Sequence, residues 1–332
     1  MNNPRVASRA FARTAPRMEY RRLKADEALP ATTLCAISFG ARRPAAAPLP
    51  ARGLGVEVNL PALVGTGMTE LWHADGKVES GRDGLVQFAR GSHYLAGKVE
   101  IDETSVGGLA EAARTAYLAI GRFTARSGHR HLLRMYNYFS DINVGDGDAE
   151  RYKVFCSGRA AGFRELAQAA WPAATAVGRQ DHSSLLQVYW LAGDEPGQPL
   201  ENPRQVSAFN YPRQYGPSPP TFSRAMQVAG AMLISGTGSV LGHASHHPDD
   251  LPAQLDEILR NHASLHQAGG VGAAAGRTLL KIYLRDAAAA GFVANYLRER
   301  VPPHAQFVVL GADICRHELL VEIDAVHLGP RD

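Results

Sequence analysis

The segment HLLRMYNYF, His131 to Phe139, reads as an apolar strand, and TLLKIYLRD, Thr278 to Asp286, repeats its pattern of leucines, a basic residue and a tyrosine. Each strand lies between two stretches with the apolar spacing of amphipathic helices. These helical stretches are 107–128, 148–163, 251–270 and 290–301. Because helix, strand and helix follow in the same order twice, we predict an internal duplication. The predicted fold class is α+β, with two fused units whose mixed sheets pack against helices.

The first 54 residues differ in composition from the rest of the chain. Residues 1–24 are rich in Arg and contain a single acid, Glu19, and residues 41–53, ARRPAAAPLPARG, are rich in Pro and Ala. An Arg-rich start is typical of transit peptides, but a disordered basic tail is the commoner explanation. We predict a basic tail and a Pro/Ala-rich lead-in segment over 1–54, an N-terminal domain over 55–200 and a C-terminal catalytic domain over 201–332.

The composition also excludes several classes of protein. A net charge of +3 is too small to indicate a nucleic-acid partner. No apolar run approaches the roughly 20 residues that a membrane span needs. The cysteines Cys35, Cys156 and Cys315 are odd in number and far apart, which argues against a zinc ribbon or a disulfide framework. We therefore expect a cytoplasmic protein whose partner is a small molecule.

Two loops could bind such a molecule. The segment AFNYPRQYGPSPPTFSRAM, 208–226, presents tyrosines and arginines between prolines, and guanidinium groups pair well with carboxylates. A surface loop with solvated arginines is the alternative. In LISGTGSVLGH, 233–243, glycines interrupt a strand, which often marks the close approach of a ligand. The second segment lacks the motif of a phosphate-binding loop.

A histidine-rich segment follows. His243, His246 and His247 precede Asp249 and Asp250, but their spacing matches no zinc motif. We expect no metal there, and predict instead a polar loop in which one of the aspartates caps the next helix.

The segment ADICRHELLVEIDA, 312–325, places Glu322 among apolar residues near the end of the chain. Glu322 is either a solvent-facing residue of a one-sided strand or a buried carboxyl whose raised pKa suits it to donate a proton. Cys315 could be a small core residue or, with His317 and Asp313, part of a hydrolase triad. The triad is disfavoured because Cys315 and His317 would lie side by side on one strand face.

These motifs resemble a known family. Residues 228–328 resemble the RidA (YjgF) superfamily through LISGTGSV, LLKIYLRD and VEIDA. Residues 55–328 resemble the chorismatase family through LLRMYNYFSDIN, RYKVFCSGRAAGF, NYPRQYGP, SGTGSVLGH and CRHELLVEIDA. RidA-type imine deaminases carry an arginine shortly before their last two strands, where this chain has PPHAQFVV with Gln306. That departure disfavours imine deamination.

The resemblance implies an enzyme that acts on chorismate without a metal or redox cofactor. Glu322 matches the family's catalytic glutamate, which protonates the enolpyruvyl group. Cys315 and Gly238 match the branch that forms 3-hydroxybenzoate and pyruvate, of which some members also release 4-hydroxybenzoate. The alternatives are hydrolysis of chorismate to a dihydroxycyclohexadiene carboxylate and a non-catalytic RidA-like binder.

Chorismate carries two carboxylates, so the resemblance also implies polar and cationic partners for them. The candidates are Tyr211, Arg213, Tyr215, Arg224, Thr237, Lys281 and Arg316. Cys315 and Glu322 are separated by an odd number of positions, and on a continuous strand they would face opposite sides. If both contact one ligand, a turn or bulge must lie within CRHELL, 315–320.

Overall fold

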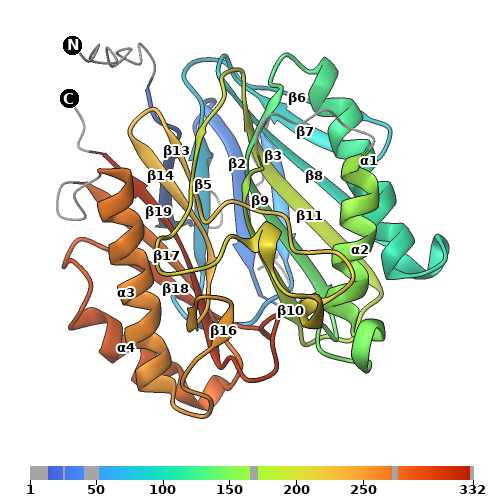
Figure 1. Cartoon of the computed structure of the whole chain (residues 1–332). Helices are drawn as coiled ribbons and strands as arrows, with labels where there is room; N and C mark the ends of the chain where they lie inside the picture. The colour runs from blue at the N-terminus through green and yellow to red at the C-terminus, as the bar shows by residue number, and fades with distance from the viewer. Residues whose placement is uncertain (1–13, 25–26, 41–51, 165–170, 271–275, 330–332) are drawn as a thin grey trace, which may run out of the picture.

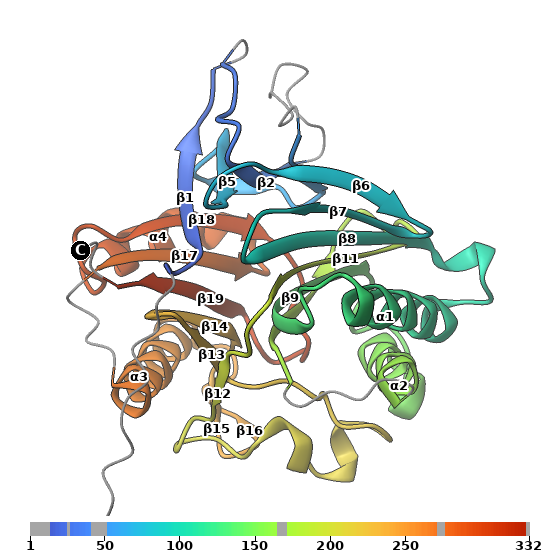
Figure 2. The same ribbon diagram turned by 90° about the horizontal axis from the view of Figure 1, so that it is seen from above.

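The structure of the chain is a computed structural model that describes residues 14–24, 27–40, 52–164, 171–270 and 276–329. An N-terminal four-stranded sheet has the order β1-β5-β2-β3. Its strands are β1 (Arg17–Arg22), β2 (Thr33–Phe39), β3 (Leu54–Val58) and β5 (Met68–His73). In Figure 2 this sheet lies across the outer side of the other two sheets, away from α1, α2 and α3.

The first repeated unit is a six-stranded sheet of order β10-β9-β11-β8-β7-β6. Its elements are β6 (Glu79–Asp83), β7 (Val86–Arg90), β8 (Tyr94–Asp102), α1 (Leu109–Arg126), β9 (His131–Ser140), α2 (Arg151–Arg164), β10 (Ala173–Arg179) and β11 (Leu185–Gly193). The helices α1 and α2 pack on one face of this sheet through a shared apolar cluster. Both helices and strand β9 confirm the elements predicted from sequence.

The second unit is a seven-stranded sheet of order β12-β13-β14-β19-β17-β18-β4. Its elements are β4 (Ala62–Val64), β12 (Gln198–Leu200), β13 (Ala225–Val228), β14 (Ala231–Thr237), α3 (Leu251–Gly269), β17 (Arg277–Leu284), α4 (Ala290–Arg298), β18 (Gln306–Gly311) and β19 (Val321–Leu328). A hairpin of β15 (Val240–Leu241) and β16 (Ala244–Ser245) precedes α3. In Figure 1, α3 and α4 lie on one side of the molecule and α1 and α2 on the other.

The two units have the same topology. Without β4, the second sheet reads β18-β17-β19-β14-β13-β12, which matches β10-β9-β11-β8-β7-β6 strand for strand. In each unit the strand between the two helices runs parallel to one neighbour and antiparallel to the other. The predicted α+β fold of two fused units is confirmed.

The N-terminal sheet corrects one prediction. The expected basic tail does not extend through Arg22, because β1 alternates the buried Met18 and Tyr20 with more exposed residues and pairs with β5. Residues 1–13, and residues 41–51 of the lead-in segment, lie outside the described residues. Over the described ranges, the helices are all too short or too polar to cross a membrane.

Buried ion pairs join the three sheets. The Lys281 Nζ lies 2.7 Å from Glu70 Oε2, and the Arg134 Nη2 lies 3.1 Å from Asp324 Oδ2. All four side chains are almost fully buried, so each charge depends on its partner. Arg134 and Lys281 occupy equivalent positions of β9 and β17, so the duplication places one cation from each unit in this shared interior.

Candidate active site

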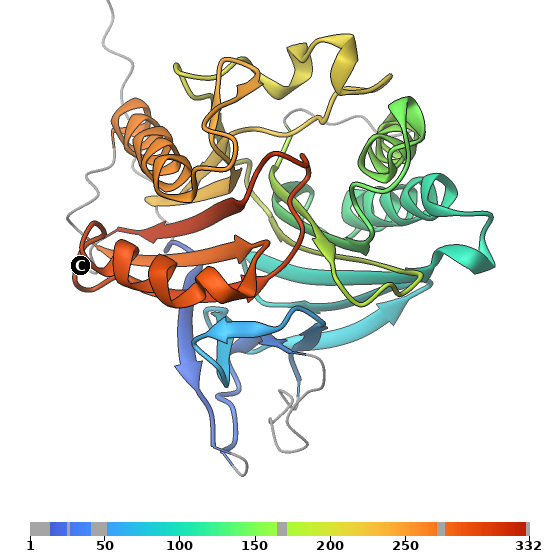
Figure 3. The ribbon, with the colours of Figure 1, turned by 90° about the horizontal axis from the view of Figure 1, so that it is seen from below.

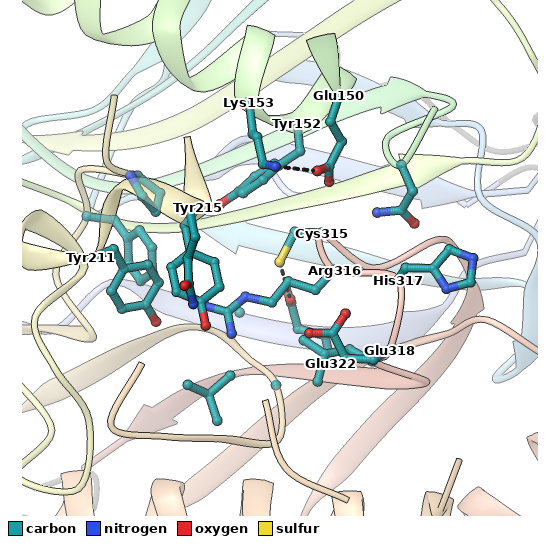
Figure 4. A pocket seen from close by; sticks show the side chains of 18 of the residues that line it. Glu150, Tyr152, Lys153, Tyr211, Tyr215, Cys315, Arg316, His317, Glu318 and Glu322 are labelled. Carbon is teal, nitrogen blue, oxygen red and sulfur yellow. Dashed lines mark hydrogen bonds and ion pairs between the residues drawn. The ribbon is translucent and has the colours of Figure 1, made fainter. Parts of the chain in front are cut away.

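A cavity of about 310 Å³ opens where the two units meet. The connection between β9 and α2, with the start of α2, forms one wall, and the segment 205–224 forms a second (Figure 4). Figure 3 shows the backbone of this segment, in yellow, between α2 in green and α3 in orange. The third wall comes from the second unit, from β14 and from the connection between β18 and β19. The cavity brings together seven of the predicted site residues: Tyr211, Tyr215, Arg224, Gly238, Cys315, Arg316 and Glu322.

Glu322 is buried on the cavity side of β19. Its strand neighbours Val321 and Ile323 pack in the cluster that includes residues of α3 and α4, so strand alternation turns Glu322 toward the first unit. Its residue is only 4% exposed, which excludes the solvent-facing alternative. Burial raises the pKa of the carboxyl to about 8, with a further upward contribution from the charge of Asp324. Glu322 is therefore protonated at neutral pH.

Asp324 lies two residues further along the same strand face. Its Oδ2 accepts hydrogen bonds from Tyr283 Oη (2.9 Å) and Thr175 Oγ1 (3.1 Å), beside the Arg134 ion pair. The charge of Asp324 contributes, after burial, to the raised pKa of Glu322.

Gly236 forms the surface against which the Glu322 carboxyl packs. A Cβ atom at position 236 would lie 2.0 Å from Glu322 Oε1, closer than any real contact. At Gly238, the predicted residue, a Cβ atom would instead meet Leu319 Cδ1 at 2.8 Å. Both glycines line the cavity, but only Gly236 makes room for the carboxyl.

Cys315 approaches Glu322 from the connection between β18 and β19. Its Sγ lies 4.0 Å from Glu322 Oε2, as the dashed line in Figure 4 shows. The predicted turn within 315–320 is confirmed, since the Leu319 amide donates to the Arg316 carbonyl at 3.1 Å. Burial raises the pKa of the Cys315 thiol well above its ordinary range, so the group is a neutral thiol. A neutral thiol is a poor nucleophile, which argues further against a hydrolase triad.

Aromatic rings and guanidinium groups line the wall formed by residues 205–224. The Arg316 guanidinium lies 4.1 Å from the centre of the Tyr215 ring and donates to the His243 carbonyl at 2.9 Å. The Arg224 Nη2 donates to Tyr211 Oη at 2.8 Å. Both arginines are held in place by these contacts and face the cavity as cations.

Three predicted binding residues do not line this cavity. Arg213 is largely exposed and forms a two-pronged ion pair with Asp148. Thr237, the last residue of β14, is buried and donates to the Ser235 carbonyl, and it faces away from the neighbouring Gly236. The predicted binding role of Lys281 is also corrected, because its ammonium group pairs with Glu70 in the interior between the sheets.

Sequence reasoning missed the contribution of α2. Lys153, which pairs with Glu150 at 3.0 Å, lines the cavity beside Tyr152. Arg159 is 4% exposed, has no ion-pair partner among the described residues, and borders a recess of about 40 Å³ next to Cys315 and Glu322. The helical spacing of positions 152, 156 and 159 in RYKVFCSGR was the available signal, because it predicts one shared face.

The histidine-rich segment leads into α3 and provides its N-cap. Asp250 is the N-cap residue of that helix, and its Oδ1 accepts from the Ala253 amide at 3.0 Å, which confirms the predicted capping role. His243 lies 3.4 Å from the Tyr215 hydroxyl. Among the residues that the structure describes, no three His, Cys, Asp or Glu side chains gather in a way that could hold a metal ion.

The chain is similar in sequence to known proteins over most of its length. A 3-hydroxybenzoate synthase of Streptomyces hygroscopicus is 35% identical over 293 residues, which cover 82% of this chain and 84% of that protein. The chain belongs to the chorismatase family. A chorismatase of Streptomyces rapamycinicus is 35% identical over 277 residues, covering 77% of this chain and 81% of that protein. A family model for the N-terminal part of FkbO/Hyg5-like chorismatases matches residues 70–192.

The structural comparison extends over nearly the whole chain. The crystal structure of a chorismatase superposes with a TM-score of 0.84 at 31% identity, and covers 95% of this chain and 98% of that one. The fold of two fused units is thus shared with a solved chorismatase.

Proposed function

We propose that the chain converts chorismate to 3-hydroxybenzoate and pyruvate. The single observation that carries the proposal is the buried, protonated Glu322 in a cavity whose walls also present Arg224, Arg316 and Lys153. An acid of this kind can protonate an enol ether at neutral pH, and the cations can hold a dicarboxylate. The 35% identity to a 3-hydroxybenzoate synthase supports this choice of product.

The reaction needs one proton donor. Glu322 protonates the methylene carbon of the enolpyruvyl group, which leaves an oxocarbenium ion at the ether carbon. The neighbouring ring hydroxyl then bonds to the ring carbon as that carbon's bond to the ether oxygen breaks, and pyruvate leaves with the ether oxygen. The hydroxyl proton passes to the Glu322 carboxylate as the oxygen bridges the two ring carbons. The bond from this oxygen to its original carbon then breaks, the carbon that keeps the oxygen loses its C–H proton, and the oxygen gains a proton as the ring aromatises. The atoms of chorismate equal those of 3-hydroxybenzoate plus pyruvate, so no water or redox partner enters.

The cavity wall supplies the other roles. Arg316 and Arg224 are placed to receive one carboxylate, since each is fixed by an aromatic ring and a neutral acceptor rather than by an acid. The thiol of Cys315 borders the space beside the Glu322 carboxyl, where an added water would divert the cation to hydrolysis.

The direct test is incubation of the purified chain with chorismate, with pyruvate measured enzymatically and aromatic products separated by chromatography. Pyruvate with 3-hydroxybenzoate is the expected result, and 4-hydroxybenzoate would be resolved on the same column. Pyruvate with a non-aromatic diene would replace the proposal by chorismate hydrolysis. No pyruvate at all would favour a RidA-like binder. Imine deamination is disfavoured because Gln306 lies at the exposed start of β18 and not in the cavity wall.

We expect Cys315→Ala to lower the share of 3-hydroxybenzoate among the products, while pyruvate release continues. Removal of the thiol leaves space for about one water molecule beside Glu322, and water would then compete with the ring hydroxyl for the activated substrate. The measurement is the ratio of 3-hydroxybenzoate to the dihydroxycyclohexadiene carboxylate at equal pyruvate release. Cys35→Ala, at a buried cysteine in the core between the sheets, is the matched control. An unchanged ratio in Cys315→Ala would remove this role from Cys315.

The pH profile should report the state of Glu322. Because burial raises its pKa to about 8, the protonated acid is present below that pH and disappears above it. We expect kcat/KM to be level between pH 6 and 7 and to fall about tenfold for each further pH unit above about 8. In Asp324→Asn the fall should begin at lower pH, since the nearby negative charge is gone and Arg134 is freed. A profile that rises through pH 8 would contradict a general-acid role.

A further inference from the structure

The connection between β18 and β19, residues 312–320, differs in length from its counterpart in the first unit. The corresponding connection between β10 and β11, residues 180–184, is shorter. Asp313 anchors the start of the longer connection through paired backbone hydrogen bonds with Gly178, at 2.7 and 2.9 Å. Gln254 anchors its end by accepting from the Leu320 amide at 2.8 Å. Cys315 and Arg316 project into the cavity from between these anchors.

The Arg285 side chain hydrogen-bonds three carbonyls in the middle of the connection. The Arg285 Nη2 donates to the carbonyls of Ile314 and Arg316, both at 3.2 Å, and so holds the residues on either side of Cys315. Its Nε donates to the Leu319 carbonyl at 3.2 Å. A carbonyl in a turn needs a donor from elsewhere, because no ladder strand pairs with it.

Arg285 also ties the connection to the two units. Its Nη1 forms an ion pair with Asp313 Oδ1 at 2.8 Å, and its Nη2 donates to Asn143 Oδ1 at 3.1 Å. Asn143 belongs to the first unit and lines the cavity. Arg285 itself comes directly after β17 and does not line the cavity. It therefore contacts the backbone behind the site rather than the space in which a substrate fits.

We propose that Arg285 is the positioning residue that holds Cys315 and Arg316 in register with Glu322, and so sets both substrate affinity and product choice. The proposal rests on the proposed conversion of chorismate. Arginine suits this task because its planar group offers five N–H donors in fixed directions. A lysine could reach only part of this set from one point. The repeat supports the assignment, since the shorter connection in the first unit presents no equivalent of Cys315 to the cavity.

The experiment compares Arg285→Met and Arg285→Lys with the unmodified chain in three measurements: hydrogen exchange of the amides of 313–320, the KM for chorismate, and the product ratio. We expect faster exchange confined to this connection, a KM roughly tenfold higher, and a smaller share of 3-hydroxybenzoate, because a displacement near 1 Å can cost on the order of 100-fold in rate. In all three measurements, the values for Arg285→Lys should lie between those for Arg285→Met and those for the unmodified chain. Arg126→Met, which removes an exposed Arg–Asp83 pair at the end of α1, should leave all three unchanged.

Asp313→Asn keeps the proposal testable if Arg285→Met does not fold. It removes one contact of Arg285 and should shift the product ratio in the same direction by less, and the double variant should be no worse than Arg285→Met alone. Unchanged exchange, or an unchanged product ratio and KM in a folded Arg285 variant, overturns the proposal. If the unmodified chain releases no pyruvate, the proposed function fails, and unchanged exchange in Arg285→Met would then separately overturn the positional role.

Discussion

Glu322→Gln should reduce pyruvate release from chorismate by roughly 10²- to 10⁴-fold, the usual contribution of a general acid. Gln keeps the shape and the neutral charge that Glu322 has at pH 7, but it has no proton to give to the enol methylene. Because burial holds the carboxyl in its protonated form, the exchange should not destabilise the fold. The measurement is kcat for pyruvate release, together with the melting temperature.

Glu318→Gln provides the matched control for that experiment. Glu318 also borders the cavity, but its side chain is exposed, so the same substitution there should lower the rate far less. If Glu322→Gln binds chorismate with unchanged affinity and releases no pyruvate, the acid role stands. Release at close to the original rate in Glu322→Gln would move the proton donor to another side chain.

Gly236→Ala should lower activity nearly as much as Glu322→Gln does, although it removes no functional group. The added methyl would lie 2.0 Å from Glu322 Oε1 and 3.2 Å from Thr175 Oγ1, so the carboxyl must move out of its position. Displacement of a catalytic group by about 1 Å can lower a rate on the order of 100-fold. We expect a loss of that size in kcat for pyruvate release.

Two other glycines calibrate this effect. At Gly238 the added methyl would meet Leu319 Cδ1, the far end of a flexible side chain that can shift, so Gly238→Ala should retain more activity. At Gly291, in α4, nothing lies within 4 Å of the added atom, and Gly291→Ala should be neutral or slightly stabilising. Equal activity in Gly236→Ala and Gly291→Ala would contradict the packing of Gly236 against the acid.

The repeated helix–strand–helix order was readable from sequence because periodicity is a local property. Apolar spacing along 107–128 and 251–270 depends only on which residues face a sheet, and both helices form where it predicted. The odd separation of Cys315 and Glu322 was informative for the same reason, since strand alternation requires a turn between them if they meet.

Residue type, in contrast, did not show which cations face the substrate. Lys281 looked like a carboxylate partner, but its partner is Glu70, a residue of β5 more than 200 positions earlier in the chain. Arg213 pairs with Asp148 across the surface, whereas Arg159 and Lys153 reach the site from α2. Charges at such sequence distances become neighbours only when the units pack, so a single sequence carries little signal for the pairing.

The sequence by itself therefore determined the duplicated α+β fold, because strand and helix patterns are encoded within a few residues of one another. It singled out Glu322 and Cys315 through short motifs that resemble the chorismatase family, whereas their pattern alone left a solvent-facing Glu322 and a core Cys315 open. Only the tertiary structure decided that Glu322 is buried, that Gly236 rather than Gly238 packs against it, and that Arg285 holds the connection carrying Cys315. The physical reason is that pKa, close packing and hydrogen-bond partners depend on atoms brought together from both units, and their distances exist only after the sheets have packed.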